Sequence, residues 1–167
     1  MELLIFSDSH GKHDGMQLAI DRQVTRVDAV IFLGDGLRDA ERLLTDGATL
    51  FSVRGNCDWF ADSDVESELT LNFEEHRLFL THGHPYGVKG GIGALISHAA
   101  DIGADIVLFG HTHRPVCEVI PAGTVVGGVT LARPMYLFNP GSIGSSEASF
   151  GTLSLKKDVV LFSHGNI

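Results

Sequence analysis

The 167-residue chain has the length of one domain, spanning residues 1–167, and its 44% hydrophobic and 20% charged content is ordinary for a globular protein. Its net charge of −9 argues against a general nucleic-acid or membrane-surface binder, because both classes need a basic face. Two cysteines are too few for a disulfide framework, and the sequence shows neither a signal peptide nor a transmembrane run, so we expect a cytoplasmic protein.

The first third of the chain alternates apolar runs with helix-like segments. Residues 3–6 and 29–33 are unbroken apolar runs, which suit strands covered on both faces, and residues 49–53 are a third strand candidate. Residues 14–24 and 37–44 have helical periodicity and lie between them. The order βαβαβ predicts a parallel sheet.

The rest of the chain is richer in strands. We expect strands over residues 68–73 and 77–80, a helix from about 91 to 102, and a strand at 106–109. Further strand candidates follow at residues 116–120, 124–131, 135–138, 150–155 and 159–162. These elements predict two packed sheets with helices outside them.

Two histidines follow the apolar run that ends at Gly110. His111 and His113 are separated by one threonine, and alternate residues of an extended chain point the same way. Neutral imidazole is the commonest metal ligand in proteins. A His-x-His pair alone is a weak signal, so a metal site requires that the fold bring other ligands to it.

Other apolar runs also end in potential metal ligands. The polar groups at these five strand ends are Asp8 with His10, Asp35, Asn56, His82 with His84, and His111 with His113. A sixth run, 136–138, ends in the segment 139–142. Because the carboxyl ends of parallel strands lie on one side of a sheet, we expect these residues to meet in one crevice.

The ligand types narrow the chemistry. Carboxylate oxygens, an amide oxygen and imidazole nitrogens suit Mn²⁺, which we favour, or Zn²⁺, Fe²⁺, Ni²⁺ or Co²⁺, and the set is too rich in nitrogen for a Ca²⁺ cage. The seven proposed ligands are Asp8, His10, Asp35, Asn56, His82, His111 and His113. One ion needs fewer, so two ions bridged by Asp35 are expected.

The ordered set resembles the calcineurin-like metallophosphoesterase superfamily. The family pattern D-x-H, G-D, G-N, H and G-H-x-H matches in order from residue 8 to residue 113, and the segment 139–142 resembles a signature of the small YfcE-type phosphodiesterases. The resemblance implies an α/β fold, a four-layer αββα sandwich of two mixed sheets flanked by helices. It also implies a phosphodiesterase whose metal-bridging hydroxide attacks phosphorus in line.

The same resemblance divides the ligands between two ions. Asp8, His10 and His113 would bind one ion and Asn56, His82 and His111 the other, with Asp35 as the bridge and Asp35 and Asn56 at the catalytic centre. The group also includes a retromer subunit that serves as a scaffold. A protein-interaction scaffold on the same fold is therefore the alternative, although a scaffold has no need of a complete ligand set.

The chain departs from the superfamily directly after its Gly-Asn motif. Many members have a histidine there that assists the leaving group, whereas this chain has Cys57 and Asp58. We expect either a preference for good leaving groups or another acid, with Asp58 and His84 as the candidates. The expected ligand is a small phosphate ester; no stable nucleic-acid or membrane partner is expected, and a homo-oligomer is possible.

Several of these residues also have simpler structural explanations. Asp8 and Asp35 could be helix N-caps, and Asn56 could be a turn residue. We predict that Cys57 is a turn residue and no nucleophile, and that Cys117 lies in the core. The simpler explanations need separate coincidences at successive strand ends, so the sequence favours a shared metal site.

Overall fold

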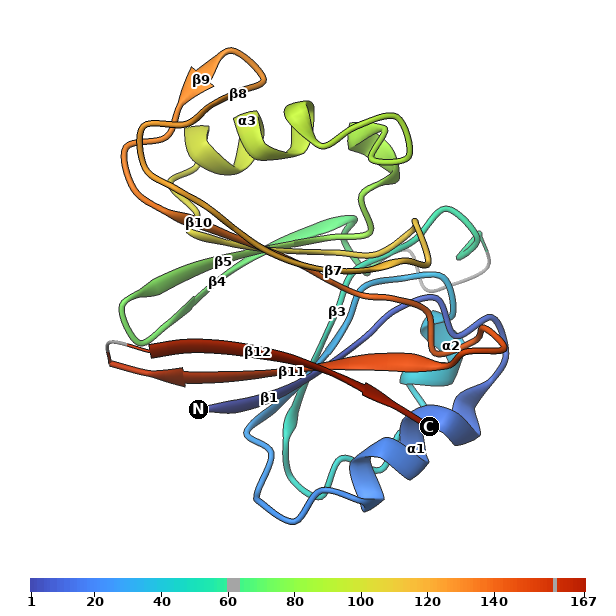
Figure 1. Cartoon of the computed structure of the whole chain (residues 1–167). Helices are drawn as coiled ribbons and strands as arrows, with labels where there is room; N and C mark the ends of the chain where they lie inside the picture. Colours follow the sequence, from blue (N-terminus) through green and yellow to red (C-terminus); the bar gives the residue numbers. More distant parts are fainter. Residues whose placement is uncertain (60–63, 158) are drawn as a thin grey trace.

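The computed structural model of the chain, which describes residues 1–59, 64–157 and 159–167, contains two five-stranded sheets that pack face to face (Figure 1). The first has the order β12-β11-β1-β2-β3, in which β1, β2 and β3 are parallel, β11 is antiparallel to β1, and β12 is antiparallel to β11. Its strands are β1 (Glu2–Phe6), β2 (Ala29–Phe32), β3 (Thr49–Ser52), β11 (Ser149–Lys156) and β12 (Val159–Asn166).

The second sheet has the order β4-β5-β6-β10-β7. Its central strands β5, β6 and β10 are parallel, and the edge strands β4 and β7 are antiparallel to them. The strands are β4 (Glu68–Phe73), β5 (His76–Thr81), β6 (Ile106–Phe109), β10 (Met135–Pro140) and β7 (Pro115–Ile120). A small separate hairpin consists of β8 (Val125–Val126) and β9 (Val129–Thr130).

Helices cover the outer face of each sheet. Two helices, α1 (His13–Asp21) and α2 (Leu37–Ala40), lie on the first sheet, and α3 (Gly93–Asp101) lies on the second (Figure 1). A 3₁₀ turn, η1 (His84–Tyr86), follows β5. The expected αββα sandwich of two mixed sheets is therefore confirmed.

Strand β1 shows why the apolar runs are unbroken. Leu3 and Ile5 point into the core between the sheets, whereas Leu4 and Phe6 pack beneath α1 and α2. All four side chains are at most 2% exposed. Since a strand between a second sheet and a helix layer has two buried faces, both sets of alternate residues must be apolar.

Some local predictions were wrong. The helix expected over 37–44 ends at Ala40, and the strand expected over 124–131 is a hairpin because Gly127 and Gly128 turn the chain at φ 58° and 83°. Cys117 is exposed on the edge strand β7 instead of buried in the core. No helix in the described part of the chain is long and apolar enough to span a membrane; the cytoplasmic location stays a prediction.

Candidate metal centre

The loops that follow β1, β2 and β6 hold their polar residues in an unusual backbone conformation. Asp8, His10, Asp35, His111 and His113 all have positive φ, between 46° and 65°. Each such non-glycine residue costs about 1–3 kcal/mol and persists only where its surroundings hold it in place. The strained backbone turns these side chains toward one edge of the sandwich, where the carboxyl ends of the parallel strands lie.

One cluster of possible ligands combines the β1 and β6 loops. The Nε2 atoms of His10 and His113 are 3.3 Å apart, and Asp8 Oδ1 lies 3.0 Å from His113 Nε2 and 3.8 Å from His10 Nε2. Asp8 is fully buried, whereas both histidines are partly open to solvent. One carboxylate oxygen and two imidazoles therefore face the same point.

A second cluster lies next to the first and combines the β2, β5 and β6 loops. His82 Nε2 lies 3.2 Å from His111 Nδ1 and 3.4 Å from Asp35 Oδ2. His82 Nε2 is also 3.9 Å from Asp8 Oδ1, so the two clusters are in contact. The β6 loop thus sends His113 to one cluster and His111 to the other.

The separations of the ligand atoms fit bound metal ions. Two nitrogens that each lie about 2.0–2.1 Å from one ion at a tetrahedral angle are about 3.3 Å apart. Both imidazole pairs match this separation, at 3.3 Å and 3.2 Å. Among the described residues, Asp8 Oδ1 and Asn56 Oδ1 are buried acceptors without a hydrogen-bond partner. Such atoms are costly unless a cation or donor meets them, so the residues present fit a metal site.

Hydrogen bonds outside the clusters fix which atoms point inward. His82 Nδ1 lies 2.7 Å from the carbonyl oxygen of Leu33, so that nitrogen donates and leaves the Nε2 lone pair free for a metal. Asp8 Oδ2 accepts hydrogen bonds from the Ser7 hydroxyl at 2.6 Å and from the His111 backbone N–H at 3.0 Å. Its other oxygen, Oδ1, is therefore the one turned toward the imidazoles.

The charges of the second cluster influence one another. Burial raises the pKa of Asp35, but hydrogen bonds from His82 and from the Cys57 backbone outweigh it, and the net pKa is below the usual range. Burial lowers the pKa of His82, yet Asp35 and Asp8 raise it above its usual value. Burial, the charge of His82 and that of Lys89 lower the pKa of His111 to about 4. The two facing imidazoles are therefore not both positively charged at neutral pH.

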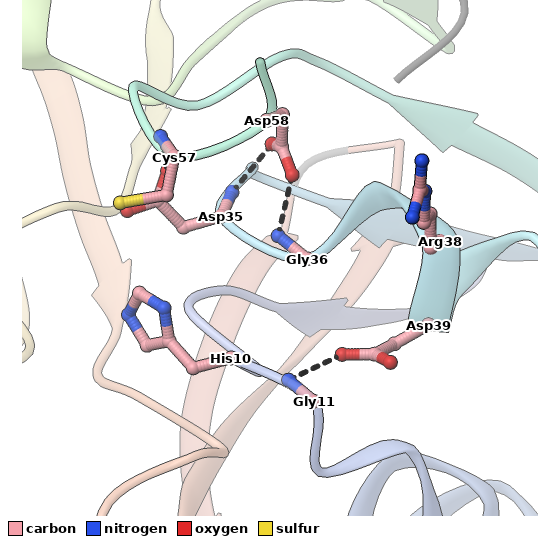
Figure 2. A pocket seen from close by; sticks show the side chains of 8 residues that line it. All are labelled: His10, Gly11, Asp35, Gly36, Arg38, Asp39, Cys57 and Asp58. Carbon is pink, nitrogen blue, oxygen red and sulfur yellow. Dashed lines mark hydrogen bonds between the residues drawn. The ribbon is translucent and has the colours of Figure 1, made fainter. Parts of the chain in front are cut away.

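Asp58 holds the Asp35 turn against the loop that follows β3. Its Oδ2 accepts hydrogen bonds from the backbone N–H groups of Asp35 and Gly55, both at 2.8 Å. Its Oδ1 accepts from those of Gly36 and Leu37 at 2.8 and 3.0 Å, and Figure 2 shows the bonds to Asp35 and Gly36. Both carboxylate oxygens thus accept hydrogen bonds, which favours the deprotonated form. The role of Asp58 as proton donor to the leaving group stays a prediction, and this geometry disfavours it.

A cavity of about 270 Å³ opens beside these turns. Figure 2 shows His10, Cys57 and Arg38 around it, and Asp35 and Asp58 also line it. Burial and the Asp35 carboxylate raise the pKa of the Cys57 thiol to about 11, so it is a thiol at neutral pH and a poor nucleophile, as the sequence predicted.

His84 lies at the edge of the second cluster. Its ring centroid is 5.5 Å from that of His82 and 6.1 Å from that of His111. Burial and the charge of His82 lower its pKa, so the imidazole is neutral at neutral pH. Its buried Nδ1 has no hydrogen-bond partner among the described residues. The predicted role of His84 in proton transfer stays a prediction.

The end of β10 and the turn that follows it support the β1 and β6 loops. The Asn139 side-chain amide donates to the Gly110 carbonyl at 2.8 Å and to Thr112 Oγ1 at 3.2 Å, and the Ser142 hydroxyl donates to the Asp8 carbonyl at 2.9 Å. The sequence of residues 139–142 does not by itself indicate this supporting role. Its supporting contacts join residues too far apart in the chain for spacing to reveal them.

The helix-cap explanation of Asp8 and Asp35 was wrong. The N-caps of α1 and α2 are Lys12 and Gly36, and neither has a capping side-chain hydrogen bond. The N–H group of Leu37, which begins α2, instead meets Asp58. Both carboxylates are therefore free to serve the clusters.

Two curated bacterial proteins and one solved structure are similar to the chain. The chain is 30% identical over 162 residues to the probable metallophosphoesterase YsnB of Bacillus subtilis, covering 95% of this chain and 86% of that protein. It is 30% identical over 184 residues to the phosphodiesterase YfcE of Escherichia coli, covering 92% of this chain and 87% of that protein. The structure matches Vps29 from Entamoeba histolytica with a TM-score of 0.73 at 21% identity, covering 100% of this chain and 99% of that one.

A family-level match covers nearly the whole chain. Residues 1–158 match the calcineurin-like phosphoesterase superfamily domain. This span contains both ligand clusters and the strands that position them. The chain therefore belongs to the calcineurin-like phosphoesterase superfamily, a metal-dependent family.

Proposed function

We propose that the chain is a phosphodiesterase that uses two divalent metal ions. The observation that carries the proposal is the pair of adjoining clusters at one edge of the sandwich. Each contains two imidazole nitrogens 3.2–3.3 Å apart and a carboxylate, and Asp8 Oδ1 of the first cluster is a buried acceptor that lacks a hydrogen-bond partner. The preference for diesters is supported by the similarity to the phosphodiesterase YfcE.

The two clusters define which residues would hold the ions. Asp8, His10 and His113 would bind one, and the Asn56 amide oxygen would join His82 and His111 on the other, with Asp35 between them. Bound ions would lower the pKa of a water molecule and balance the charge that develops on the phosphoryl oxygens. The mixed oxygen and nitrogen donors suit Mn²⁺, which we favour, or Zn²⁺, Fe²⁺, Ni²⁺ or Co²⁺.

The protein itself supplies orientation. The Cys57 backbone N–H donates to Asp35 Oδ1 at 2.7 Å, and Asp58 holds the backbone of Asp35. These bonds fix the Asp35 carboxylate before substrate arrives. Preorganisation of this kind lowers the barrier because the site does not have to rearrange during the reaction.

The test is hydrolysis of bis-p-nitrophenyl phosphate by chelated protein to which single metals are returned. We expect activity to return with metal, and Asp35→Asn to lower kcat/KM by more than about a hundredfold, the upper end of the effect of groups that only support metal ligands. Asp101→Asn is the matched control, because Asp101 is exposed at the end of α3 and lies in neither cluster.

The alternative function is a non-catalytic scaffold on the same fold. The structural likeness to Vps29 is compatible with that role. The observation against it is that, within each cluster, the ligand atoms of one aspartate and two histidines all lie within 4.8 Å of one another, which a scaffold does not require. If metal-loaded protein hydrolyses no more diester than the Asp35→Asn variant, the phosphodiesterase proposal is wrong and the scaffold is favoured.

A further inference from the structure

A second cavity adjoins the metal ligands on the side of β6 and α3. It has a volume of about 430 Å³, which is within the usual range of small-molecule sites. Val88, Ile92 and Phe109 form apolar parts of its wall, and Thr112 lines it as well. Thr112 lies between His111 and His113 in the chain, so the cavity borders the β6 loop that supplies a histidine to each cluster; we call it the β6 cavity.

Hydrogen bonds to Thr112 fix one wall of the β6 cavity. Thr112 Oγ1 accepts hydrogen bonds from the Asn139 side chain at 3.2 Å and from the Arg114 backbone N–H at 3.3 Å. Asn139 is fully buried, and Phe109 is only 2% exposed. The backbone that carries the Arg114 side chain is therefore fixed relative to the metal ligands.

The β6 cavity carries positive charge in an acidic protein. Lys89 and Arg114 line it, no aspartate or glutamate does, and within the described parts of the chain neither cation forms an ion pair. The charge of Lys89 also reaches the imidazole of His111. In a chain of net charge −9, two unpaired cations beside a substrate site favour an anionic ligand there.

Neighbouring cavities next to the clusters differ in charge. The one beside Asp35 is lined by one cation, Arg38, and by three carboxylates, those of Asp35, Asp39 and Asp58. Another, of about 440 Å³ beside His113, is lined by Glu147 and by no lysine or arginine. A phosphodiester centred on the ligands must place its two organic arms on different sides. An arm that carries its own negative charge is therefore favoured in the β6 cavity.

We propose that the β6 cavity binds one arm of the diester substrate, and that this arm is an apolar or aromatic group bearing a second phosphate or carboxylate. The apolar wall would bury the body of the arm, and Lys89 and Arg114 would contact its anionic end. Arginine is suited to this contact because its guanidinium pairs with phosphate or carboxylate through two parallel hydrogen bonds. The inference rests on the proposed phosphodiesterase activity and adds the class of substrate.

The kinetic test compares two substrates that differ by one phosphate: the p-nitrophenyl ester of thymidine 5′-phosphate, and the same ester with a 3′-phosphate. We expect the wild-type enzyme to have a higher kcat/KM for the second ester, mainly through KM. In Lys89→Ala/Arg114→Ala that preference should fall about tenfold, which corresponds to about 1.4 kcal/mol. A matching terminal carboxylate in place of the 3′-phosphate tells the two anions apart.

The control variant removes the same charge elsewhere. Lys156→Ala/Lys157→Ala alters exposed side chains where β11 ends, and β11 pairs antiparallel to β1, so they lie at the opposite end of the sheet from the ligands. It should keep the wild-type preference. An unchanged preference in Lys89→Ala/Arg114→Ala, or an equal loss in both double variants, would overturn the proposal.

A binding measurement separates this inference from the proposed activity. Calorimetry of Mn²⁺-loaded protein with thymidine 3′,5′-bisphosphate and thymidine 5′-phosphate needs no turnover. We expect the bisphosphate to bind about tenfold more tightly, and the difference to vanish in Lys89→Ala/Arg114→Ala. Equal affinities would refute the β6 cavity as an anion-binding subsite even if the enzyme is active. Absent hydrolysis with a retained difference in affinity would instead refute only the activity.

Discussion

Replacing Asp58 with asparagine tests whether this residue positions the site or supplies a proton. Its carboxylate accepts four backbone hydrogen bonds of 2.8–3.0 Å, two on each oxygen. Asparagine keeps one acceptor oxygen, so two N–H groups would face an amide that cannot accept. At about 1.5–3 kcal/mol for each hydrogen bond to a charged group, Asp58→Asn should destabilise the protein by roughly 3–6 kcal/mol.

This loss is large for a domain, whose free energy of unfolding is typically about 5–15 kcal/mol. For a chain of this size each 1 kcal/mol lowers Tm by about 2–4 °C, so a decrease of roughly 6–24 °C is expected in differential scanning calorimetry. The Asp35 turn would also loosen, because Asp58 Oδ2 is the acceptor for its backbone N–H. Metal affinity and hydrolysis should therefore fall together.

Two substrates distinguish positioning from acid catalysis. One is bis-p-nitrophenyl phosphate, whose leaving group needs no proton, and the other is a dialkyl diester, whose leaving group does. A positioning role predicts that Asp58→Asn lowers both rates by a similar factor. If Tm is unchanged and only the dialkyl ester loses rate, Asp58 is the acid and the hydrogen-bond argument is refuted.

Three further predictions concern the same loops. Gly55→Ala should abolish metal binding in calorimetry, because its Cβ would collide with Asp35 Oδ1 and with the Asp35 backbone nitrogen; wild-type affinity would contradict this. In metal-free protein, His111 has a pKa of about 4 in the folded state and an ordinary pKa of 6.5 in the unfolded state. Between these two pH values the unfolded chain binds more protons, so the free energy of unfolding decreases as pH falls. His111→Gln should reduce that slope in urea unfolding, and an unchanged slope would show that other groups cause it. In Cys117→Ser protein, Cys57 should react with iodoacetamide about a hundredfold more slowly folded than in urea, because its pKa is raised from 9.0 to about 11, and equal rates would rule this out.

The sandwich could be predicted because each layer leaves a signal in the sequence. Runs such as Leu3–Phe6 are apolar on both faces, which only strands between two layers require. Boundaries were less predictable where a few backbone groups decide them. Helix α2 ends at Ala40, and the hairpin turn at Gly127 and Gly128 follows from backbone conformations that apolar patterning does not report.

The convergence of the candidate ligands could also be predicted, because each follows a strand and the carboxyl ends of parallel strands lie on one side of a sheet. The groups that hold the ligands could not. Asp58 receives its four N–H groups from two loops, and Asn139 reaches the β6 loop from a strand 29 residues away. The β6 cavity was equally hidden, since Lys89 and Arg114 come from separate segments and meet only through the fold.

The backbone and the unpartnered atoms of the centre point to coupling between metal binding and the folding of its loops. Five ligands hold positive φ, and Asp8 Oδ1 and Asn56 Oδ1 are buried acceptors that no described donor satisfies. Each of these features raises the free energy of the loops without metal, by about 1–3 kcal/mol per strained residue. Coordination would offset that cost, because binding to a site that exists only in the folded state is itself folding free energy. The strain is therefore compatible with a stable protein whose loops are most rigid when the metal is bound.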